Sequence, residues 1–508
     1  MRILVWHGWL LEGSGSNVAT ARVAEVWRRA GHDVLLLCQE RHPDRYAWID
    51  ASGTIDADGP SPLRPNPDAS EAAGRCVLLR PLIGSLLPVF VVDAYEGFDR
   101  VVAFVDLSDE ELASYLRANE EALRAAAAFH DPDVAFVGHA IPGGPLGRRA
   151  LGAGAAVVKI HGSDLEYAVR PQERYADLAR EGLGGARAVV GASADVVARA
   201  TELVPGIEEL GWVVAPGVDV TAFRPRPAVD ALREVARLLD GNPEVAHGRP
   251  SSLDDEVERA LDARDVEGIH ALMGRYEEFA PERDAAARLR TVAARGGSTI
   301  GYLGKLIPQK GVEHFLQARA NLRHEAATLV VGPGSAREWL AALVIALRRG
   351  DRPAIEWIRE EGGFPLEPDA VGAPAPNLDV GFTGLLDHRY APGVLAALDV
   401  QVVPSVLQEA FGMVAAEGAA AGALPVVARH SGLAEIAAAL EADVGRPGLF
   451  SFEPGGGSVQ RLSDAVDRLL SLPPDERREL RDAVSSFVAT HWTWERAAAG
   501  LLAAAGGR

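Results

Sequence analysis

The sequence has 508 residues, of which 48% are hydrophobic and 24% charged, which is enough for two or three globular domains. Its 51 basic and 71 acidic residues give a net charge of −20, which argues against a general nucleic-acid-binding protein because such proteins need a basic surface. The longest uncharged apolar stretch, residues 81–92, is well short of the ~20 residues that a transmembrane helix needs, although peripheral contact with a membrane stays open. The two cysteines, Cys38 and Cys76, favour a reducing, cytoplasmic location.

The N-terminal part of the chain alternates strand and helix signals. Residues 3–6 and 33–37 are apolar runs typical of buried parallel strands, and between them lie a Gly/Ser-rich loop at 13–17 and a helical pattern at 18–29. Strand, helix and strand at this spacing form a βαβ unit. Further apolar runs predict strands at 134–137, 156–160, 188–190 and 211–214. We therefore predict an α/β domain over residues 1–223.

Residues 224–297 lack strand signals. Charged stretches separated by Gly- and Pro-containing breaks predict helices at 228–239, 254–263, 266–279 and 282–294. We expect this segment to be a helical insertion or linker, and such helices keep a partner-binding role open.

A second series of strand signals follows this segment. It predicts a second α/β domain over residues 298–490, interrupted by a helical excursion at 336–361 and followed by a C-terminal helix in residues 491–508. The expected strands are 299–303, 328–332, 380–384, 400–404 and 424–428. In doubly wound α/β domains, ligands bind outside the carboxyl ends of the strands. The loops that follow these strands are therefore where a functional site is expected.

The loop after the strand at 400–404 carries the strongest functional signal. It contains Glu409 and turns into a small-residue helix, on which Glu417 follows eight residues later and can face the same side. Two carboxylates there could accept hydrogen bonds from sugar hydroxyls. The free N–H groups and partial positive charge of a helix start suit a diphosphate, and a glycine there would let a ligand approach the backbone. We predict that this helix start binds a ligand through Phe411, Gly412, Met413 and Val414.

Glu409-x7-Glu417, with Phe411-Gly412 inside it, resembles the E-x7-E motif of retaining glycosyltransferases with the GT-B fold, and is most similar to glycosyltransferase family 4. The resemblance covers most of the chain except residues 224–297 and 335–378. It implies two facing Rossmann-like domains with a deep cleft between them, and a last helix that returns to the N-terminal domain. Other segments similar to motifs of the family are 161–164, 215–219, 304–311, 331–334 and 381–384.

Two lysines follow the strand at 299–303. Lys305 and Lys310 could stabilise the negative charge that develops on a diphosphate leaving group. The family usually has arginine at the first position, and Lys305 supplies charge without a bidentate fork. By resemblance, Lys310 and Glu409 belong to the catalytic residues, Glu409 binds hydroxyls of the donor sugar, and Glu417 binds the ribose of the nucleotide.

In the N-terminal domain, the resemblance implies that Gly15 and Ser16 close over the donor and that His161 lies near the donor sugar as a further catalytic residue. His139 has a weaker claim as an acceptor-side residue. The first loop lacks the third glycine of a dinucleotide fingerprint, so no nicotinamide cofactor is expected. We also predict no catalytic metal, because the Asp-x-Asp pairs at 56–58 and 131–133 lack supporting ligands.

The implied reaction is transfer of a sugar from a nucleotide-diphosphate donor to a saccharide, lipid or small-molecule acceptor, with retention at the anomeric carbon. Two alternatives stay open. One is a sugar-nucleotide epimerase, which shares this architecture and needs no acceptor. The other is a non-catalytic relative that binds a nucleotide sugar or a partner protein. No motif specifies the base, the sugar or the acceptor.

Overall fold

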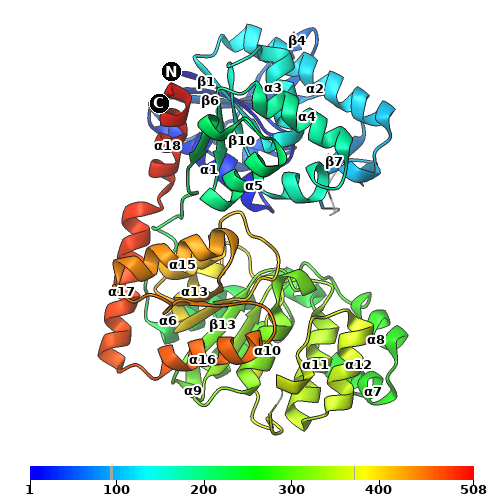
Figure 1. Cartoon of the computed structure of the whole chain (residues 1–508), viewed down its shortest axis with the longest axis vertical. Coiled ribbons are helices and arrows are strands. Elements are labelled where there is room, and N and C mark those ends of the chain that lie inside the picture. The colour runs from blue at the N-terminus through cyan, green and yellow to red at the C-terminus, as the bar shows by residue number, and fades with distance from the viewer. Residues whose placement is uncertain (92–94, 96, 371, 508) are drawn as a thin grey trace. The chain divides into compact units, whose positions relative to one another are not determined.

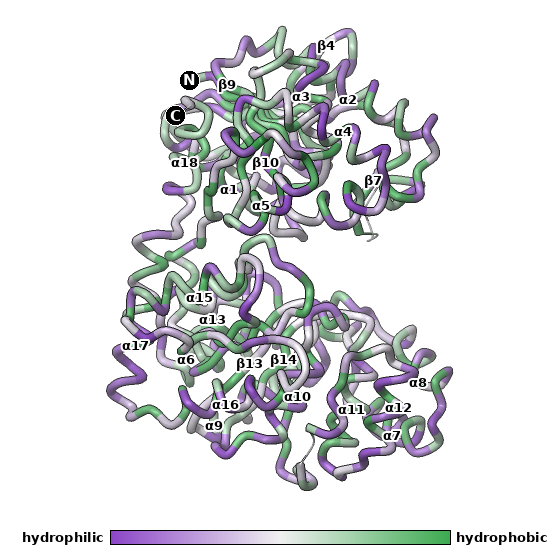
Figure 2. The backbone as a smooth tube through the Cα atoms, in the orientation of Figure 1, coloured by the Kyte–Doolittle hydropathy of each residue, from purple (hydrophilic) through white to green (hydrophobic). Residues whose placement is uncertain are grey.

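The computed structural model describes residues 1–91, 95, 97–370 and 372–507, which form two compact units. Unit 1 contains Met1–Gly217 and the C-terminal segment from Trp492, and unit 2 is Val218–His491. Each unit has a mostly parallel sheet with helices packed on it (Figure 1). Hydrophobic residues are concentrated along the central strands (Figure 2), as expected for parallel sheets covered on both faces. The predicted α/β fold class is confirmed.

The sheet of unit 1 has ten strands in the order β12-β11-β10-β9-β1-β2-β6-β3-β4, with β5 paired to β3. All pairings are parallel except those of β3 with β4 and β5. The strand bounds are β1 Arg2–Trp6, β2 Asp33–Leu37, β3 Ala51–Asp56, β4 Gly59–Pro60, β5 Arg64–Pro65, β6 Arg75–Pro81, β9 Val134–Gly138, β10 Ala156–Lys159, β11 Ala188–Gly191 and β12 Gly211–Val213.

The first helix of unit 1 begins earlier than expected. The Gly/Ser-rich segment was expected to be a loop up to Asn17, but α1 begins at Gly15 because Ser14 caps it, its Oγ accepting from Asn17 N at 3.4 Å. Within the apolar stretch 81–92, Leu86–Val89 forms β7, which pairs with β8 (Arg100–Ala103), and residue 92 lies outside the described residues. The helix bounds are α1 Gly15–Arg29, α2 Asp109–His130, α3 Gly144–Leu151, α4 Glu173–Gly184, α5 Ala194–Leu203 and α18 Trp494–Gly506.

The last helix, α18, packs on α1, although more than 460 residues separate them in the sequence. Trp27 Nε1 donates a hydrogen bond to the carbonyl oxygen of Ala498 at 3.2 Å. A side chain at Gly217 would collide with the backbone of Trp494, 2.2 Å from its nitrogen, so the end of the first segment also lies against this helix.

The sheet of unit 2 is entirely parallel, with the order β15-β14-β13-β16-β17-β18. The chain winds outward in one direction from β13 to β15 and in the other from β16 to β18, so a topological switch point lies between β13 and β16. The bounds are β13 Thr299–Leu303, β14 Ala327–Val331, β15 Val380–Phe382, β16 Val400–Val403, β17 Leu424–Ala428 and β18 Ser451–Phe452.

The helices expected as an insertion, residues 224–297, all belong to unit 2, in two groups. In the first group, α6 (Ala228–Asp240) packs on α9 (Ala285–Arg295) and on α13 (Ala391–Ala397). In the second, α7 (Asp254–Ala263) and α8 (Val266–Met273) pack on α11 (Arg337–Arg349), beside α12 (Arg352–Gly362), as Figure 1 shows. The helix expected over 266–279 ends early, at Met273. The other helices are α10 Val312–Ala320, α14 Met413–Ala420, α15 Ser431–Asp443, α16 Ser458–Leu470 and α17 Pro474–His491.

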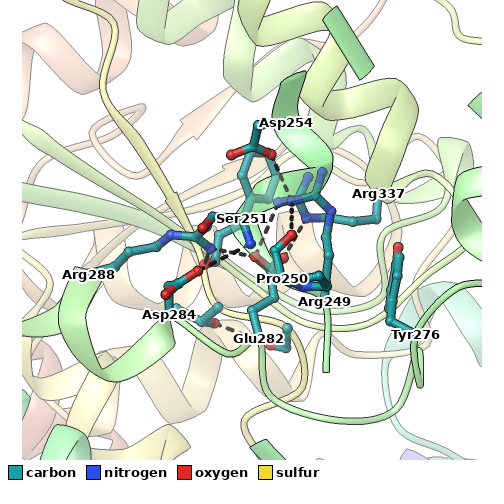
Figure 3. A network of polar contacts seen from close by, with 12 residues as sticks. Arg249, Pro250, Ser251, Asp254, Tyr276, Glu282, Asp284, Arg288 and Arg337 are labelled. Carbon is teal, nitrogen blue, oxygen red and sulfur yellow. Dashed lines mark hydrogen bonds and ion pairs between the residues drawn. The ribbon is translucent and has the colours of Figure 1, made fainter. Parts of the chain in front are cut away.

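A buried network of ion pairs joins α7 and the segment before it to α11 and α9 (Figure 3). Arg249 forms two hydrogen bonds to Glu338, at 2.7 and 2.8 Å, with both side chains almost completely buried. Arg337 pairs likewise with Glu282, which also contacts Arg288. Burial alone would raise the pKa of Glu282, but its arginine partners lower it to about 2. Loss of one partner from such a pair costs about 3–5 kcal/mol, so this network fixes the inserted segment in unit 2.

No helix among the described residues has both the length and the apolar character needed to cross a membrane.

Candidate functional site

The loops after β13 and β16 meet at the switch point of unit 2. Lys310, in the loop after β13, places its Nζ 2.5 Å from Oε1 of Glu409, in the loop after β16. Both side chains are partly exposed, at 31% and 22%. The backbone also joins these loops, because Val406 N and Leu407 N donate to the carbonyl oxygen of Gln309. The structure therefore brings together Lys310 and Glu409, two of the three predicted catalytic residues.

Three further contacts hold Glu409. Ser405 Oγ donates to Glu409 Oε1 at 2.9 Å, and Glu409 N donates to Ser431 Oγ at 2.9 Å. The carbonyl oxygen of Glu409 accepts from Gly432 N at 3.1 Å. Ser431 and Gly432 follow β17. The residues around Glu409 therefore come from the segments that follow three adjacent strands, β13, β16 and β17.

Two glycines make the close approach of these loops feasible. Gly311 has φ of 69°, and a Cβ there would lie 2.1 Å from the carbonyl oxygen of Pro404. Gly412 has φ of 104°, and a Cβ there would lie 2.4 Å from Cδ2 of Leu433. Leu433 thus occupies the direction of the missing side chain, and the approach of a ligand to the backbone of Gly412 stays a prediction. The backbone conformation at this position and the packing of Leu433 require a glycine.

The predicted ligand-binding helix start is the start of α14. Gly412 precedes it in a left-handed conformation and provides no side-chain cap, and the first turn contains no acidic residue. Ala415 N donates to the carbonyl oxygen of Gly412 at 2.9 Å, whereas the N–H groups of Met413 and Val414 precede the first intrahelical hydrogen bonds of α14. Phe411 is buried, whereas Met413 and Val414 are partly exposed, so this end of the helix can meet an anion.

Glu417 lies on the second turn of α14, and its side chain is 13% exposed. Burial raises the pKa of Glu417 to about 8. In the described part of the chain its one ion-pair partner is His388, whose Nε2 lies 4.0 Å away. At pH 7 the carboxyl is therefore mostly protonated, and a ligand that supplies hydroxyl donors would favour its charged form.

Lys305 is exposed in the loop after β13. The buried Tyr302 donates from its hydroxyl to the carbonyl oxygen of Lys305 at 2.8 Å, which fixes the backbone of this loop. The backbone position of Lys305 is thus defined by the core of unit 2, on the same strand end as Lys310.

The remaining predicted site residues lie in unit 1. Gly15 and Ser16 are the first two residues of α1, with Gly15 exposed and Ser16 partly buried. His161 follows β10, and its backbone N donates to Asp164 Oδ1 at 3.3 Å. Asp164 is fully buried and also accepts from Ala140 N at 2.6 Å, so it joins the loops after β9 and β10. Burial raises the pKa of Asp164 to about 6 despite its backbone donors.

Three histidines follow the adjacent strands β1, β9 and β10 at the carboxyl edge of the sheet: His7, His139 and His161. The rings of His139 and His161 are 4.4 Å apart, and those of His7 and His139 are 6.1 Å apart. Burial lowers the pKa of His7 to about 4, and lowers those of the other two well below the ordinary value, with the neighbouring charges adding to the effect. The cluster is therefore neutral at physiological pH.

Acidification should destabilise unit 1 through this cluster. Below pH 6.5 the unfolded chain binds protons at the three histidines while the folded cluster stays neutral, so stability is lost as the pH falls from 6.5 towards 4, by up to about 1.4 kcal/mol per pH unit for each ring. Asparagine tolerates the positive φ of position 139. His139→Asn should therefore reduce the pH slope of the unfolding free energy by about the contribution of one histidine. Urea unfolding between pH 7 and 5 measures this slope. Equal slopes for both proteins would contradict the expectation.

Sequence reasoning missed Ser405, His430 and Ser431, which surround Glu409. Two of these residues could have been found from the sequence. His430 and Ser431 follow β17, the strand next to β16, at the sheet edge where ligands bind in such folds. It also missed the packing of His7 beside His139 and His161, which follows from the adjacency of their strands.

Comparison with known sequences shows that part of unit 2 matches a described protein family. Residues 376–486 match the family described as "Glycosyl transferases group 1". The 2-deoxystreptamine glucosyltransferase of Streptomyces kanamyceticus is 31% identical over 191 residues, which are 37% of this chain and 40% of that protein. The chain thus matches less than half the length of this relative.

Solved structures match the whole chain. Sucrose-phosphate synthase from Thermosynechococcus elongatus aligns with a TM-score of 0.56 at 17% identity, covering 99% of this chain and 97% of that one. Anabaena HepE in complex with UDP and glucose aligns with a TM-score of 0.55 at 13% identity, covering 99% and 98%. At these identities the likeness shows the fold. The chain therefore has the GT-B fold, and its residues 376–486 match the group 1 glycosyltransferase family.

Proposed function

We propose that this chain is a retaining glycosyltransferase of the family 4 type, which transfers a sugar from a nucleotide-diphosphate donor to an acceptor. The observation that carries the proposal is the contact between Lys310 and Glu409 beside the uncapped start of α14, at the switch point of unit 2. The group 1 match includes this helix and both glutamates. The similarity to a glucosyltransferase, and to a protein that binds UDP and glucose, supports the same reaction class.

In this reaction the bond between the anomeric carbon and a diphosphate oxygen breaks, and a bond to an acceptor hydroxyl oxygen forms on the same face. The leaving diphosphate gains negative charge and takes up the acceptor's proton. The N–H groups at the start of α14, with Lys305 and Lys310, would stabilise that charge. Glu409 would accept from the sugar hydroxyls and Glu417 from the ribose. Unit 1 would contribute His161, Gly15 and Ser16 and would bind the acceptor.

The ion pair between Lys310 and Glu409 explains how both residues could serve one donor. The lysine has three N–H donors and needs only one for Glu409, so it can bind a phosphate oxygen while it holds the carboxylate in place. We also propose a cytoplasmic location, since Cys38 and Cys76 are both buried free thiols.

Nucleotide binding is the first test. UDP, GDP or ADP at 100 times its dissociation constant should stabilise the folded protein by about 2.7 kcal/mol, and Glu417→Ala should abolish this thermal shift. Glu479→Ala, on the exposed face of α17, is the matched control and should keep the shift. A shift with one nucleotide identifies the base for donor screens. No shift with any of the three, together with no nucleotide release from sugar donors, would contradict the proposal. A changed sugar nucleotide without any acceptor product would instead indicate an epimerase.

A further inference from the structure

Ser431 has an unusual backbone conformation for its residue type. Its φ is 50°, in the left-handed region that glycine adopts readily and other residues rarely do. It is the first residue of α15, next to Gly432, where a Cβ would lie 2.6 Å from the carbonyl oxygen of Ala410. A strained non-glycine residue in such close contact with the loop after β16 suggests that its side chain is needed there.

The side chain of Ser431 belongs to a chain of hydrogen bonds whose direction can be deduced. His430 Nε2 lies 2.7 Å from the carbonyl oxygen of Ser405, which can only accept, so Nε2 carries the proton. In the neutral ring, Nδ1 is then an acceptor, and it lies 3.0 Å from Ser431 Oγ, which must donate to it. Ser431 Oγ in turn accepts from Glu409 N at 2.9 Å.

The chain closes on Glu409. Ser405, whose carbonyl oxygen accepts from His430, donates from its own Oγ to Glu409 Oε1 at 2.9 Å. Glu409 is therefore held at both its backbone nitrogen and its carboxylate by one closed ring of hydrogen bonds. Residues 404–412 contain no helix or strand that could hold Glu409 instead. Because the ring is closed, loss of any member releases the others from their fixed orientation.

We propose that His430 and Ser431 are positioning residues for Glu409, and that the strained conformation of Ser431 is kept because it directs Oγ to the Glu409 amide. This inference rests on the proposed function, in which Glu409 binds the donor sugar. Misplacing a group that stabilises a transition state lowers turnover more than it lowers ground-state binding.

Ser431→Gly separates positioning from folding. Glycine accepts the left-handed conformation, so the melting temperature should not fall, whereas the acceptor for the Glu409 amide is lost. We expect kcat to fall about tenfold to a hundredfold, with little change in KM for the donor and an unchanged thermal shift with the nucleotide. Ser471→Gly, at an exposed position after α16, is the control and should keep full turnover. Unchanged kcat in Ser431→Gly would overturn the proposal.

A double-mutant cycle tests whether Ser431 acts through Glu409. In a Glu409→Gln background, Ser431→Gly should change the residual rate by less than twofold. A loss as large as that in the wild type would show an independent structural effect and would overturn the proposal. His430→Gln keeps an N–H that can donate to Ser405, and should retain more activity than His430→Leu; equal losses would contradict the part assigned to His430.

Hydrogen exchange of the Glu409 amide tests positioning without any enzymatic activity. The amide should exchange at least tenfold faster in Ser431→Gly than in the wild type, and at the wild-type rate in Ser471→Gly. This measurement separates the two proposals. Faster exchange in a protein that transfers no sugar would disprove the proposed function alone, whereas an unchanged rate would overturn the positioning proposal.

Discussion

Glu409→Gln should lower the turnover of glycosyl transfer by about a hundredfold to a thousandfold, the usual effect of losing one group that stabilises a transition state. Glutamine keeps the volume of the side chain and can still accept from Ser405, so the local structure should survive. It removes the negative charge that holds Lys310 Nζ at 2.5 Å, so the ammonium group loses its fixed place as well. The contact of residue 409 with the sugar hydroxyls and the contact of Lys310 with the diphosphate should therefore weaken together.

The same variant should fold normally. The ion pair is partly exposed, and such pairs contribute about 1 kcal/mol or less to stability. Circular dichroism and the melting temperature check the fold, and initial rates with a labelled sugar donor check turnover. Glu479→Gln on α17 is the matched control. Turnover within threefold of the wild type in Glu409→Gln would remove this residue from the catalytic machinery.

Nucleotide affinity should rise with pH up to about pH 8 and then level off. The ribose hydroxyls would donate to the ionised carboxylate of Glu417, and burial raises the pKa of Glu417 to about 8 in the unliganded protein. Below pH 8, binding must therefore remove a proton, so the dissociation constant should fall about tenfold for each pH unit between 6 and 8. Calorimetric titration at several pH values measures this slope.

The phosphates of the nucleotide also ionise in this pH range, and Glu417→Gln distinguishes their effect from that of Glu417. In this variant, the pH dependence of the dissociation constant should lack the contribution of Glu417. The variant should also be more stable than the wild type at pH 8 to 9. In the wild type, the unfolded state loses its proton near pH 4.5 and the folded state near pH 8, so folding stability falls over this range and not above it. Equal stability of the two proteins at pH 8.5 would show that the carboxyl is better solvated than its burial indicates.

Most strands of the two sheets and the start of α14 could be predicted because they depend on local patterns. Short apolar runs predicted β1, β2, β9–β12 and β13–β17 but not β3, β4, β5, β6 and β18, and the small-residue helix after Phe411 predicted the start of α14. The pairing of Lys310 with Glu409 could not be predicted, since two loops 99 residues apart meet only through the strand order. That order also places His430 and Ser431 beside the site.

The inserted helices were found in the sequence, but their placement was not. Arg249 and Glu338 look like surface residues in the sequence, because nothing local shows that each is the partner of the other. Their burial is a property of the assembled unit 2. The neutral state of the histidine cluster has the same origin, since His7 and His161 lie more than 150 residues apart and are buried together only in the sheet.

The location of α18 has a consequence for how the chain folds during synthesis. Unit 2 is continuous in the sequence, whereas unit 1 is completed only when residues 492–508 return to α1. A chain emerging from the ribosome can therefore finish unit 2 while Trp27 still lacks its hydrogen bond to Ala498. The N-terminal unit, although synthesised first, is the last to reach its complete fold, and a polypeptide released early would carry a finished unit 2 and an unfinished unit 1.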